Sequence, residues 1–327
     1  MQFSFTSDQS EFAASLREML EREFTAAHLR VVWDDNSGHD QKLWDRLAEM
    51  GVLSMMLPEA DGGLGGDYID TVLLIEELGR AAVPGPVVET MTVGALALAG
   101  TSLAAGVADG STPVTAVLMG ERYVPHASTA SILLTGVENE VHAIENPSFT
   151  DEVLDGIDGG RRLSRLADSA SGGIVLTADR DRLVDAGALA ASAYLLGLSS
   201  RMLAIAGDYA RDRRQFGQPI GAFQAVKHLM ADALLKVEFA RPAIYRAAWS
   251  FANDTPDRAR DVSMAKSLAS DAALKAARSA LQVHGAIGYT WECDLQLYMK
   301  KAWALAPAWG SASSHRRRVA DAVLGPR

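Results

Sequence analysis

The sequence predicts a mostly α-helical protein with a small β block in its middle. Two long regions, about residues 6–106 and 184–327, carry apolar side chains at the three- and four-residue spacing of helices. Between them, short apolar runs alternate with glycine, proline, asparagine and aspartate, which is the pattern of short strands and turns. We therefore expect an N-terminal helical domain (1–110), a reduced β domain (111–183) and a C-terminal four-helix bundle (184–327).

The N-terminal domain is predicted to begin with a helix after Thr6. Thr6 and Gln9 have the spacing of a capping box, and an apolar face follows at helical intervals. That face consists of Phe12, Leu16, Met19, Leu20 and Phe24. Further helices are expected over about 41–50 and 68–80. The glycine-rich stretch between them is predicted to be a turn, because the third glycine of a GxGxxG phosphate loop would fall on Tyr68.

The other two domains are predicted from the lengths of their apolar runs. Four short runs bounded by turn-forming residues are typical of strands. These runs are Val114–Leu118, Ile132–Thr135, Val141–Ile144 and Gly173–Leu176. Four long helical patterns joined by short turns follow, which is the pattern of an up-and-down bundle. They cover about 188–211, 224–251, 256–284 and 291–324.

Composition excludes several classes of function. The formal net charge of −10 argues against nucleic acid as a partner, because neutralising phosphates requires a basic surface. Cys293 is the only cysteine in the sequence. A single cysteine excludes an internal disulfide framework and a cysteine-based zinc site, and it is consistent with a reducing cytoplasm. The seven histidines are scattered, so no metal site is expected. We expect neither a signal peptide nor a membrane span, and the predicted location is the cytoplasm.

The stretch over residues 211–224 joins two predicted helices and is rich in cations, amides and aromatic rings. Pro219, Gly217 and Gly221 interrupt helix formation there. Arginine side chains suit a pyrophosphate and aromatic side chains suit a flat ring, so the stretch is a candidate nucleotide-binding site. A solvated turn between two helices is the alternative interpretation.

Four stretches resemble motifs of the acyl-CoA dehydrogenase family. Leu57–Gly65 is similar to the family's PEExGGLG turn, and Tyr209–Gln224 is similar to its C-terminal flavin motif. Gln282–Thr290 is similar to the QxxGGxGYT motif, with Ala286 in place of the second glycine, and Trp291–Tyr298 is similar to the segment that follows. The resemblance is to actinobacterial members that act on CoA thioesters of sterols and related compounds, in particular to the short non-catalytic subunit of heterotetrameric members.

The resemblance implies a fold and a reaction. Family members have an α domain, a β domain and a four-helix C-terminal domain, which is similar to the order predicted above. They desaturate an acyl-CoA between its α and β carbons. A carboxylate takes the α proton, a step that contributes about 10²–10⁴ in rate, and FAD takes a hydride from the β carbon. The electrons are expected to leave through an electron-transfer flavoprotein or a similar acceptor.

The resemblance also implies which residues bind FAD. The guanidinium of Arg213 would pair with the pyrophosphate, and the rings of Phe216 and Phe223 would pack on the adenine or the ribose. Glutamine amides would reach the nucleotide, and small residues after the third helix would let a phosphate approach backbone N–H groups. The full set is Arg213, Gln215, Phe216, Ile220, Phe223, Gln224, Gln282, Gly285 and Ala286.

The chain departs from the family pattern in two places. The family's TEPxxGSD and WxTN segments, which hold the flavin of their own subunit, have no counterpart between Ser111 and Arg182. The catalytic glutamate is also missing. Trp309 stands at its usual position, and Gly187 stands at the upstream position that a minority of members use. No catalytic residue and no metal ligand is therefore assigned to this chain.

The retained and the missing residues serve different flavins. In the family, the retained motifs reach the flavin of the neighbouring subunit, whereas the missing ones act on the flavin of their own subunit. The resemblance thus implies one half of an α₂β₂ heterotetramer, inactive alone, that completes the FAD site of a partner subunit carrying the base. The substrate would be an acyl-CoA such as a steroid side-chain CoA thioester. One alternative is a homomeric dehydrogenase with a relocated base such as Asp185, and another is a flavin-free scaffold or CoA-ester-binding protein.

Overall fold

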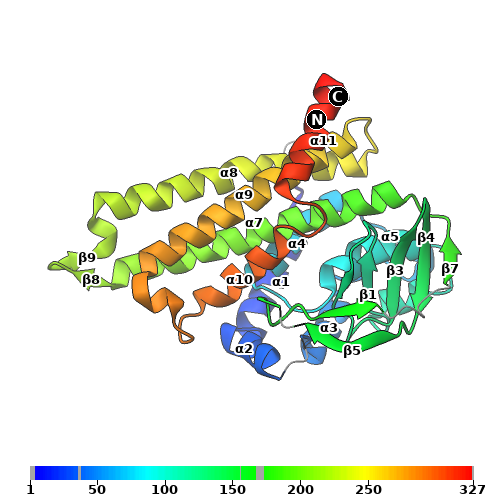
Figure 1. Cartoon of the computed structure of the whole chain (residues 1–327), viewed down its shortest axis with the longest axis horizontal. Coiled ribbons are helices and arrows are strands. Elements are labelled where there is room, and N and C mark those ends of the chain that lie inside the picture. The colour runs from blue at the N-terminus through cyan, green and yellow to red at the C-terminus, as the bar shows by residue number, and fades with distance from the viewer. Residues whose placement is uncertain (1–3, 36–37, 155, 167–172, 326–327) are drawn as a thin grey trace. The chain divides into compact units, whose positions relative to one another are not determined.

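The computed structural model describes residues 4–35, 38–154, 156–166 and 173–325 and divides into two compact units (Figure 1). Unit 1 consists of Met1–Leu74 and Val83–Ala190, and unit 2 consists of Ile75–Ala82 and Ala191–Arg327. The predicted order of N-terminal helices, a small β block and C-terminal helices is confirmed. The boundaries of the three predicted domains stay a prediction.

The N-terminal part of unit 1 is built from short helices. They are α1 (Ser7–Glu23), α2 (Ala26–Asp34), α3 (Gln41–Glu49), η1 (Glu59–Asp61), the start of α4 (Tyr68–Arg80), η2 (Glu89–Gly94), α5 (Ala95–Leu98) and α6 (Ala104–Ala108). The capping box of α1 is confirmed: the Gln9 N–H donates to Thr6 Oγ1 over 3.2 Å, and the Thr6 N–H donates to Gln9 Oε1 over 2.9 Å. The predicted apolar face of α1 is buried at Leu16, Met19 and Leu20.

The β block of unit 1 contains two small sheets. The first has the order β1-β3-β4-β7, in which β1 and β3 are parallel and the other pairs are antiparallel. Its strands are β1 (Val114–Val117), β3 (Ile132–Val137), β4 (Glu140–Glu145) and β7 (Ile174–Leu176), and they correspond to the four predicted runs. The second sheet has the antiparallel order β2-β6-β5, and the sequence did not predict it. Its strands are β2 (Tyr123–Pro125), β5 (Phe149–Leu154) and β6 (Leu163–Leu166).

Unit 2 is a helical bundle. Its long helices are α7 (Arg180–Asp212, in unit 2 from Ala191), α8 (Gln224–Ala252) and α9 (Arg258–His284), followed by η4 (Gly285–Tyr289), α10 (Leu295–Leu305) and α11 (Ala312–Leu324). A small hairpin of β8 (Arg214–Gln215) and β9 (Gln218–Pro219), then η3 (Ile220–Ala222), joins α7 to α8. In Figure 1 this hairpin lies at the left-hand end of α7 and α8.

The prediction of one final helix over 291–324 is wrong. The chain forms α10 and α11 instead, with a break after Leu305. In that break Trp309 has φ +57° and Gly310 has φ +95°, and neither value is compatible with a right-handed helix.

The end of α4 crosses α7 within unit 2 at two glycines. A Cβ atom on Gly79 would lie 2.2 Å from the carbonyl oxygen of Tyr194, and one on Gly197 would lie 1.9 Å from that of Glu76. Because no side chain fits in either space, only glycine allows the two helices to approach this closely. The crossing places Glu76 where Arg241 of α8 binds it, with Arg241 Nη1 2.5 Å from Glu76 Oε1.

One helix of the described chain is long and apolar enough to cross a membrane by length and composition alone. This helix is α7, and the expectation that the chain has no membrane span stays a prediction. Within the structure, 72% of its apolar window is buried against the rest of the protein, as in a core helix of a folded domain.

Candidate functional site: an exposed cradle at one end of the bundle

The β8–β9 hairpin presents the central residues of the nucleotide motif. Arg214 pairs with Pro219 and Gln215 with Gln218, which leaves a two-residue turn at Phe216 and Gly217. The φ angles of these two residues are +53° and +81°, so both have the left-handed backbone that a type I′ hairpin turn requires.

Phe216 occupies a position that is unusual for an aromatic residue. Asparagine, aspartate and glycine adopt positive φ most readily, whereas a bulky side chain there costs on the order of 1–3 kcal/mol. Its ring is 91% exposed, and within the chain it meets the ring of Phe223 edge-on, with centroids 6.1 Å apart and planes at 84°. A strained and exposed ring of this kind suits contact with a flat ligand or another polypeptide.

The end of α9 supplies the second part of the cradle. Gln282 is exposed, and the chain leaves the helix at Gly285, which has φ +63° and ψ −139°. A Cβ atom on Gly285 would meet no heavy atom within 4 Å, so the backbone angle and not crowding favours glycine here. The Gly285 N–H donates to the carbonyl of Leu281, so this donor is already used within the chain. Ala286 follows and is exposed.

A ring stack connects the two parts of the cradle. The side chain of Tyr209, near the end of α7, lies against that of His284, the last residue of α9, with centroids 4.4 Å apart and planes at 17°. His284 is 6% exposed, and its Nδ1–H donates to the carbonyl of Ala280 over 2.8 Å. The Arg213 N–H in turn donates to the Tyr209 carbonyl over 2.8 Å, so the stack helps to fix where the hairpin begins.

The cradle carries positive charge without internal partners. Arg213 and Arg214 are exposed and form no ion pair with another described residue, whereas the neighbouring Arg211 pairs with Asp208.

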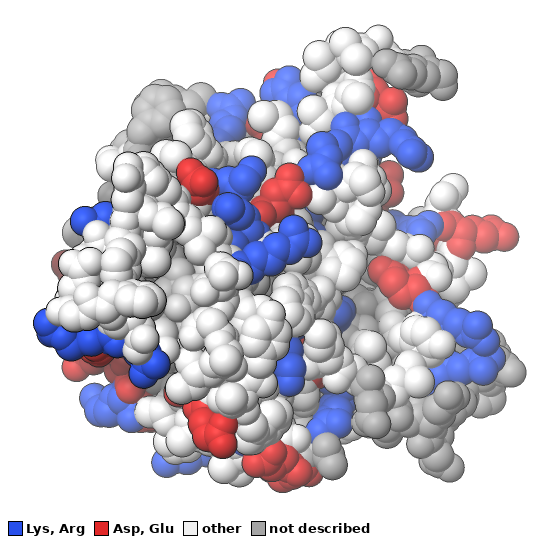
Figure 2. Space-filling model, turned by 60° about the vertical axis from the view of Figure 1, so that its left-hand side comes forward, with Lys and Arg blue, Asp and Glu red and all other residues white. Residues whose placement is uncertain are grey.

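The remaining predicted residues of this stretch are uncharged. Gln215 is exposed, and Ile220 is half-buried in η3. The side-chain amide of Gln224 contacts the ring of His228 over 3.0 Å. Figure 2 turns the hairpin end of Figure 1 towards the viewer and shows basic and acidic side chains interspersed on that face.

The donor set of the cradle fits a flavin dinucleotide. Two guanidinium groups suit the pyrophosphate, the rings suit the adenine, and exposed amides suit the ribose or the base. All nine predicted residues lie in unit 2, in the segments 213–224 and 282–286. The predicted set did not include Arg214 or Tyr289, which is 80% exposed in η4. Two signals could have found them: Arg214 directly follows Arg213, and Tyr289 lies within the Gln282–Thr290 stretch that resembles a family motif.

Trp309 stands in a turn that three buried side chains hold in place. It is 6% exposed, and its carbonyl accepts a hydrogen bond of 2.8 Å from Nε2–H of His315. Lys266, which is fully buried, donates to the carbonyls of Ala306 over 2.7 Å and Gly310 over 3.1 Å.

The imidazole of His315 is held as one neutral tautomer. The Ser263 hydroxyl contacts its Nδ1 over 3.2 Å, so the proton is on Nε2. Burial lowers the pKa of His315 to about 4, so its imidazole is neutral at pH 7.

The other two residues considered for the base lie in the part of α7 that belongs to unit 1. Gly187 is buried and has no side chain that could accept a proton. Asp185 is 1% exposed. The Tyr68 hydroxyl donates to the carbonyl of Ala186 between them over 2.6 Å. Burial raises the pKa of Tyr68, and the nearby charge of Asp185 contributes in the same direction.

Comparison with known proteins gives matches over nearly the whole chain. A family model described as "Acyl-CoA dehydrogenase, N-terminal domain" matches residues 6–104, and one described as "Acyl-CoA dehydrogenase, C-terminal domain" matches residues 181–324. The chain is 32% identical over 322 residues to the acyl-CoA dehydrogenase IpdE2 of Mycolicibacterium smegmatis, covering 96% of this chain and 100% of that one.

Two further similarities concern larger proteins or assemblies. The chain is 33% identical over 290 residues to the acyl-CoA dehydrogenase FadE34 of Mycobacterium tuberculosis, covering 84% of this chain but 41% of that one. Among solved structures, it is similar to a chain of a Tcur3481-Tcur3483 steroid ACAD variant, with a TM-score of 0.87 and 26% identity. That similarity covers 97% of this chain and 98% of the other.

Proposed function

The chain belongs to the acyl-CoA dehydrogenase family, and we propose that within it this protein is a subunit that completes the FAD site of a partner subunit. Members of the family generally bind FAD. The proposal is that the base and the remaining flavin contacts come from the partner, so that this chain supplies binding groups but no proton acceptor.

The observation that carries the proposal is the exposure of the cradle. Arg213, Phe216, Gln224 and Gln282 are presented to solvent at one end of unit 2. A dinucleotide laid on this surface alone would have one face in water, where ion pairs and ring contacts contribute little. A second polypeptide that covers the other face would exclude water and strengthen the same contacts.

The two base positions give independent support. Trp309 has no basic atom that can accept a proton, because its indole nitrogen is only a donor. Gly187 has no side chain, and Asp185 is buried in the interior of unit 1. Since the α proton of a thioester is only weakly acidic, desaturation without a positioned base would be slow. The base must then come from another chain.

The similarities to larger proteins support a partner. In FadE34 a unit like this chain makes up 41% of the protein, so it is joined there to a further segment longer than itself. The structural relative carries two names in its title, which supports a complex of two different chains, and the word steroid, which supports a steroid CoA thioester as the substrate of the complex.

Each residue of the cradle has a role in this proposal. The Arg213 guanidinium pairs with the pyrophosphate, with Arg214 adding a second positive charge, and the Phe216 and Phe223 rings pack on the adenine or the ribose. Gln224 and Gln282 donate amide hydrogen bonds. When bound, FAD accepts the hydride from the β carbon of the acyl-CoA, and an electron-transfer flavoprotein or a similar acceptor receives the electrons. We place the assembled α₂β₂ complex in the cytoplasm.

The test is the flavin content and activity of the chain purified alone and co-purified with the product of a neighbouring gene. We expect the chain alone to be nearly colourless and to reduce no electron acceptor with any acyl-CoA. The complex should be yellow, with one FAD for each pair of different subunits, and active. Stoichiometric flavin and turnover by the chain alone would overturn the proposal in favour of a homomeric enzyme.

A further inference from the structure

The side chains of Gln224 and His228 are in contact at the start of α8. The amide nitrogen Nε2 of Gln224 lies 3.0 Å from the ring nitrogen Nε2 of His228. Both side chains are exposed, and their separation of four residues places them on the same side of the helix. Gln224 is one of the residues predicted to bind FAD, whereas His228 is not. The contact therefore connects a residue outside the predicted set to the cradle.

The two atoms in contact determine which group donates the hydrogen bond. An amide nitrogen can only donate, so Gln224 Nε2–H donates and His228 Nε2 accepts. A ring nitrogen accepts only when it carries no proton, so the imidazole of His228 is neutral, with its proton on Nδ1. The contact uses one of the two amide hydrogens of Gln224. Its carbonyl oxygen and its second N–H are available to a ligand.

An acceptor and a donor side by side in one plane match one edge of adenine. At that edge the 6-amino group donates and the ring nitrogen N7 accepts, and a glutamine amide can bind both at once. A ribose hydroxyl offers a single oxygen and does not need this paired arrangement. Hypoxanthine, which has a carbonyl oxygen in place of the 6-amino group, presents two acceptors at the same edge. The orientation of the Gln224 amide therefore selects between the two bases.

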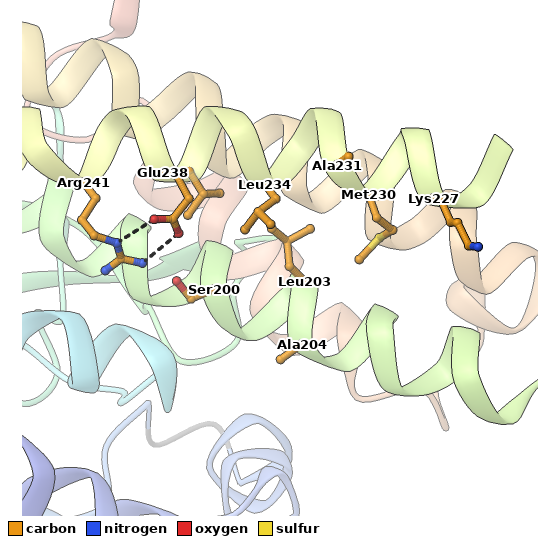
Figure 3. A pocket seen from close by; sticks show the side chains of 10 residues that line it. Ser200, Leu203, Ala204, Lys227, Met230, Ala231, Leu234, Glu238 and Arg241 are labelled. Carbon is orange, nitrogen blue, oxygen red and sulfur yellow. Dashed lines mark hydrogen bonds and ion pairs between the residues drawn. The ribbon is translucent and has the colours of Figure 1, made fainter. Parts of the chain in front are cut away.

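Lys227 precedes His228 in the chain but lies on another face of α8. Consecutive residues of a helix are turned by about 100° from each other. Together with Leu203 and Leu234, Lys227 lines a groove of about 650 Å³ between α7 and α8 (Figure 3). Lys227 is thus a control position that is next to His228 in sequence and takes no part in the contact with Gln224.

We propose that His228 is a positioning residue, which sets the orientation of the Gln224 amide and so the preference of the flavin site for adenine. His228 holds the amide nitrogen towards itself. The Gln224 carbonyl oxygen then accepts from the 6-amino group, and the second N–H donates to N7. The inference rests on the proposed function, because its ligand is the FAD of the partner subunit. It adds a residue that acts on FAD only through Gln224.

The test compares FAD with its hypoxanthine analogue. The dissociation constants of both ligands are measured by fluorescence titration of the apo-complex, and their ratio is calculated. Because the ligands share the flavin, the ribose and the phosphates, the ratio reports on the base alone. We expect the wild-type complex to bind FAD about tenfold more tightly than the analogue. Gln224→Leu should reduce this ratio to within about threefold of one.

Two substitutions at His228 separate a positioning role from a structural one. Glutamate only accepts, so His228→Glu should keep the Gln224 amide nitrogen turned inwards and preserve the preference for FAD. Lysine only donates, so His228→Lys should turn the amide round and abolish or reverse the preference. The charges that these variants introduce act on the phosphates of both ligands equally. Lys227→Glu changes the charge beside His228 and should leave the ratio as in the wild type.

A measurement on the chain without flavin tests the contact itself. Long-range correlation spectra of the chain labelled with nitrogen-15 histidine show which ring nitrogen of His228 carries the proton, and His228→Leu identifies its signals. We expect the proton on Nδ1 in the wild type. In Gln224→Leu no amide donates to Nε2, so the proton should move towards Nε2.

The results that would contradict the inference differ from those that contradict the proposed function. Equal ratios for His228→Glu and His228→Lys overturn the inference, as does a wild-type complex without a preference for FAD. A proton on Nε2 of His228 in the wild-type chain also overturns it. If Arg213→Ala instead leaves the affinity of the complex for FAD unchanged, the proposed function fails. The spectra then still decide whether His228 orients the Gln224 amide.

Discussion

The rings of Tyr209 and His284 stack with centroids 4.4 Å apart, and through this contact the end of α7 is fixed to the end of α9. Arg213, which directly precedes the β8–β9 hairpin, lies four residues after Tyr209, and Gln282 lies two residues before His284. The stack therefore sets the spacing between the two halves of the cradle. It also explains why the histidine is buried although it lies next to exposed residues.

Removing this stack should loosen the cradle without unfolding the bundle. Aromatic pairs contribute about 0.5–1.5 kcal/mol beyond their buried area, so Tyr209→Leu should raise the dissociation constant of FAD from the complex by about 2- to 10-fold. Tyr209→Phe keeps the ring and should bind FAD like the wild type. Fluorescence titration of the apo-complex measures both constants. Equal affinities for the leucine and phenylalanine variants would show that the stack does not position the site.

A substitution at Phe216 should weaken the binding of FAD without lowering the stability of the chain. Phe216→Asn gives the residue pair that a type I′ turn favours most, and 91% of the phenylalanine is exposed, so little packing is lost. We expect the thermal midpoint of the chain alone to stay the same or rise, while FAD binding by the complex weakens. Differential scanning calorimetry and a flavin titration provide the two measurements. A clear fall of the midpoint would mean that the ring stabilises the chain itself.

The buried imidazole of His315 should make the bundle sensitive to acid. Its pKa in the folded chain is about 4, below the ordinary 6.5, so protonation favours the unfolded state. The contribution is fully present above pH 6.5 and is lost as the pH falls towards 4, by up to about 3 kcal/mol. His315→Gln should flatten the dependence of the denaturation midpoint on pH in this window. The exposed His28→Gln should leave it unchanged, and a slope that both variants preserve would contradict this account.

Restoring a carboxylate at the usual base position should not create an enzyme. In Trp309→Glu the side chain would stand in a turn fixed by His315 and Lys266, but the family segments that hold the flavin of their own subunit would still be missing. We expect no acyl-CoA-dependent reduction of an electron acceptor by this variant alone. The wild-type chain is the control, and any activity above it would show that the chain holds flavin without help.

Much of the fold was predictable because it depends on local patterns. Helical spacing gave α1, α8 and α9, and the capping box at Thr6 gave the start of α1. The break between α10 and α11 was not predictable, because Lys266 and His315 hold Trp309 and Gly310 through contacts between residues far apart in the sequence. The strands β2, β5 and β6 were missed because they are short and partly polar.

The candidate site was predictable to a similar degree. The motifs gave the identities of the cradle residues, such as Arg213 and Gln282, because ligand chemistry depends on residue type and spacing. They did not give the exposure of Phe216 or the stack on His284, which depend on how the ends of three helices meet. The N–H of Gly285 was expected to face a phosphate, but the helix end uses it.

The most direct test of the central claim is a titration of FAD into apo-complexes built with wild-type and Arg213→Ala chains. A charge-assisted contact to phosphate is worth about 1.5–3 kcal/mol, so the alanine variant should raise the dissociation constant about 10- to 100-fold. Arg213→Lys should recover only part of this, because an ammonium group cannot bind two oxygens side by side. Arg211→Ala, which removes an arginine already paired with Asp208, is the matched control and should bind like the wild type. Equal affinities of the wild-type and Arg213→Ala complexes would contradict the claim that this chain completes the flavin site of its partner.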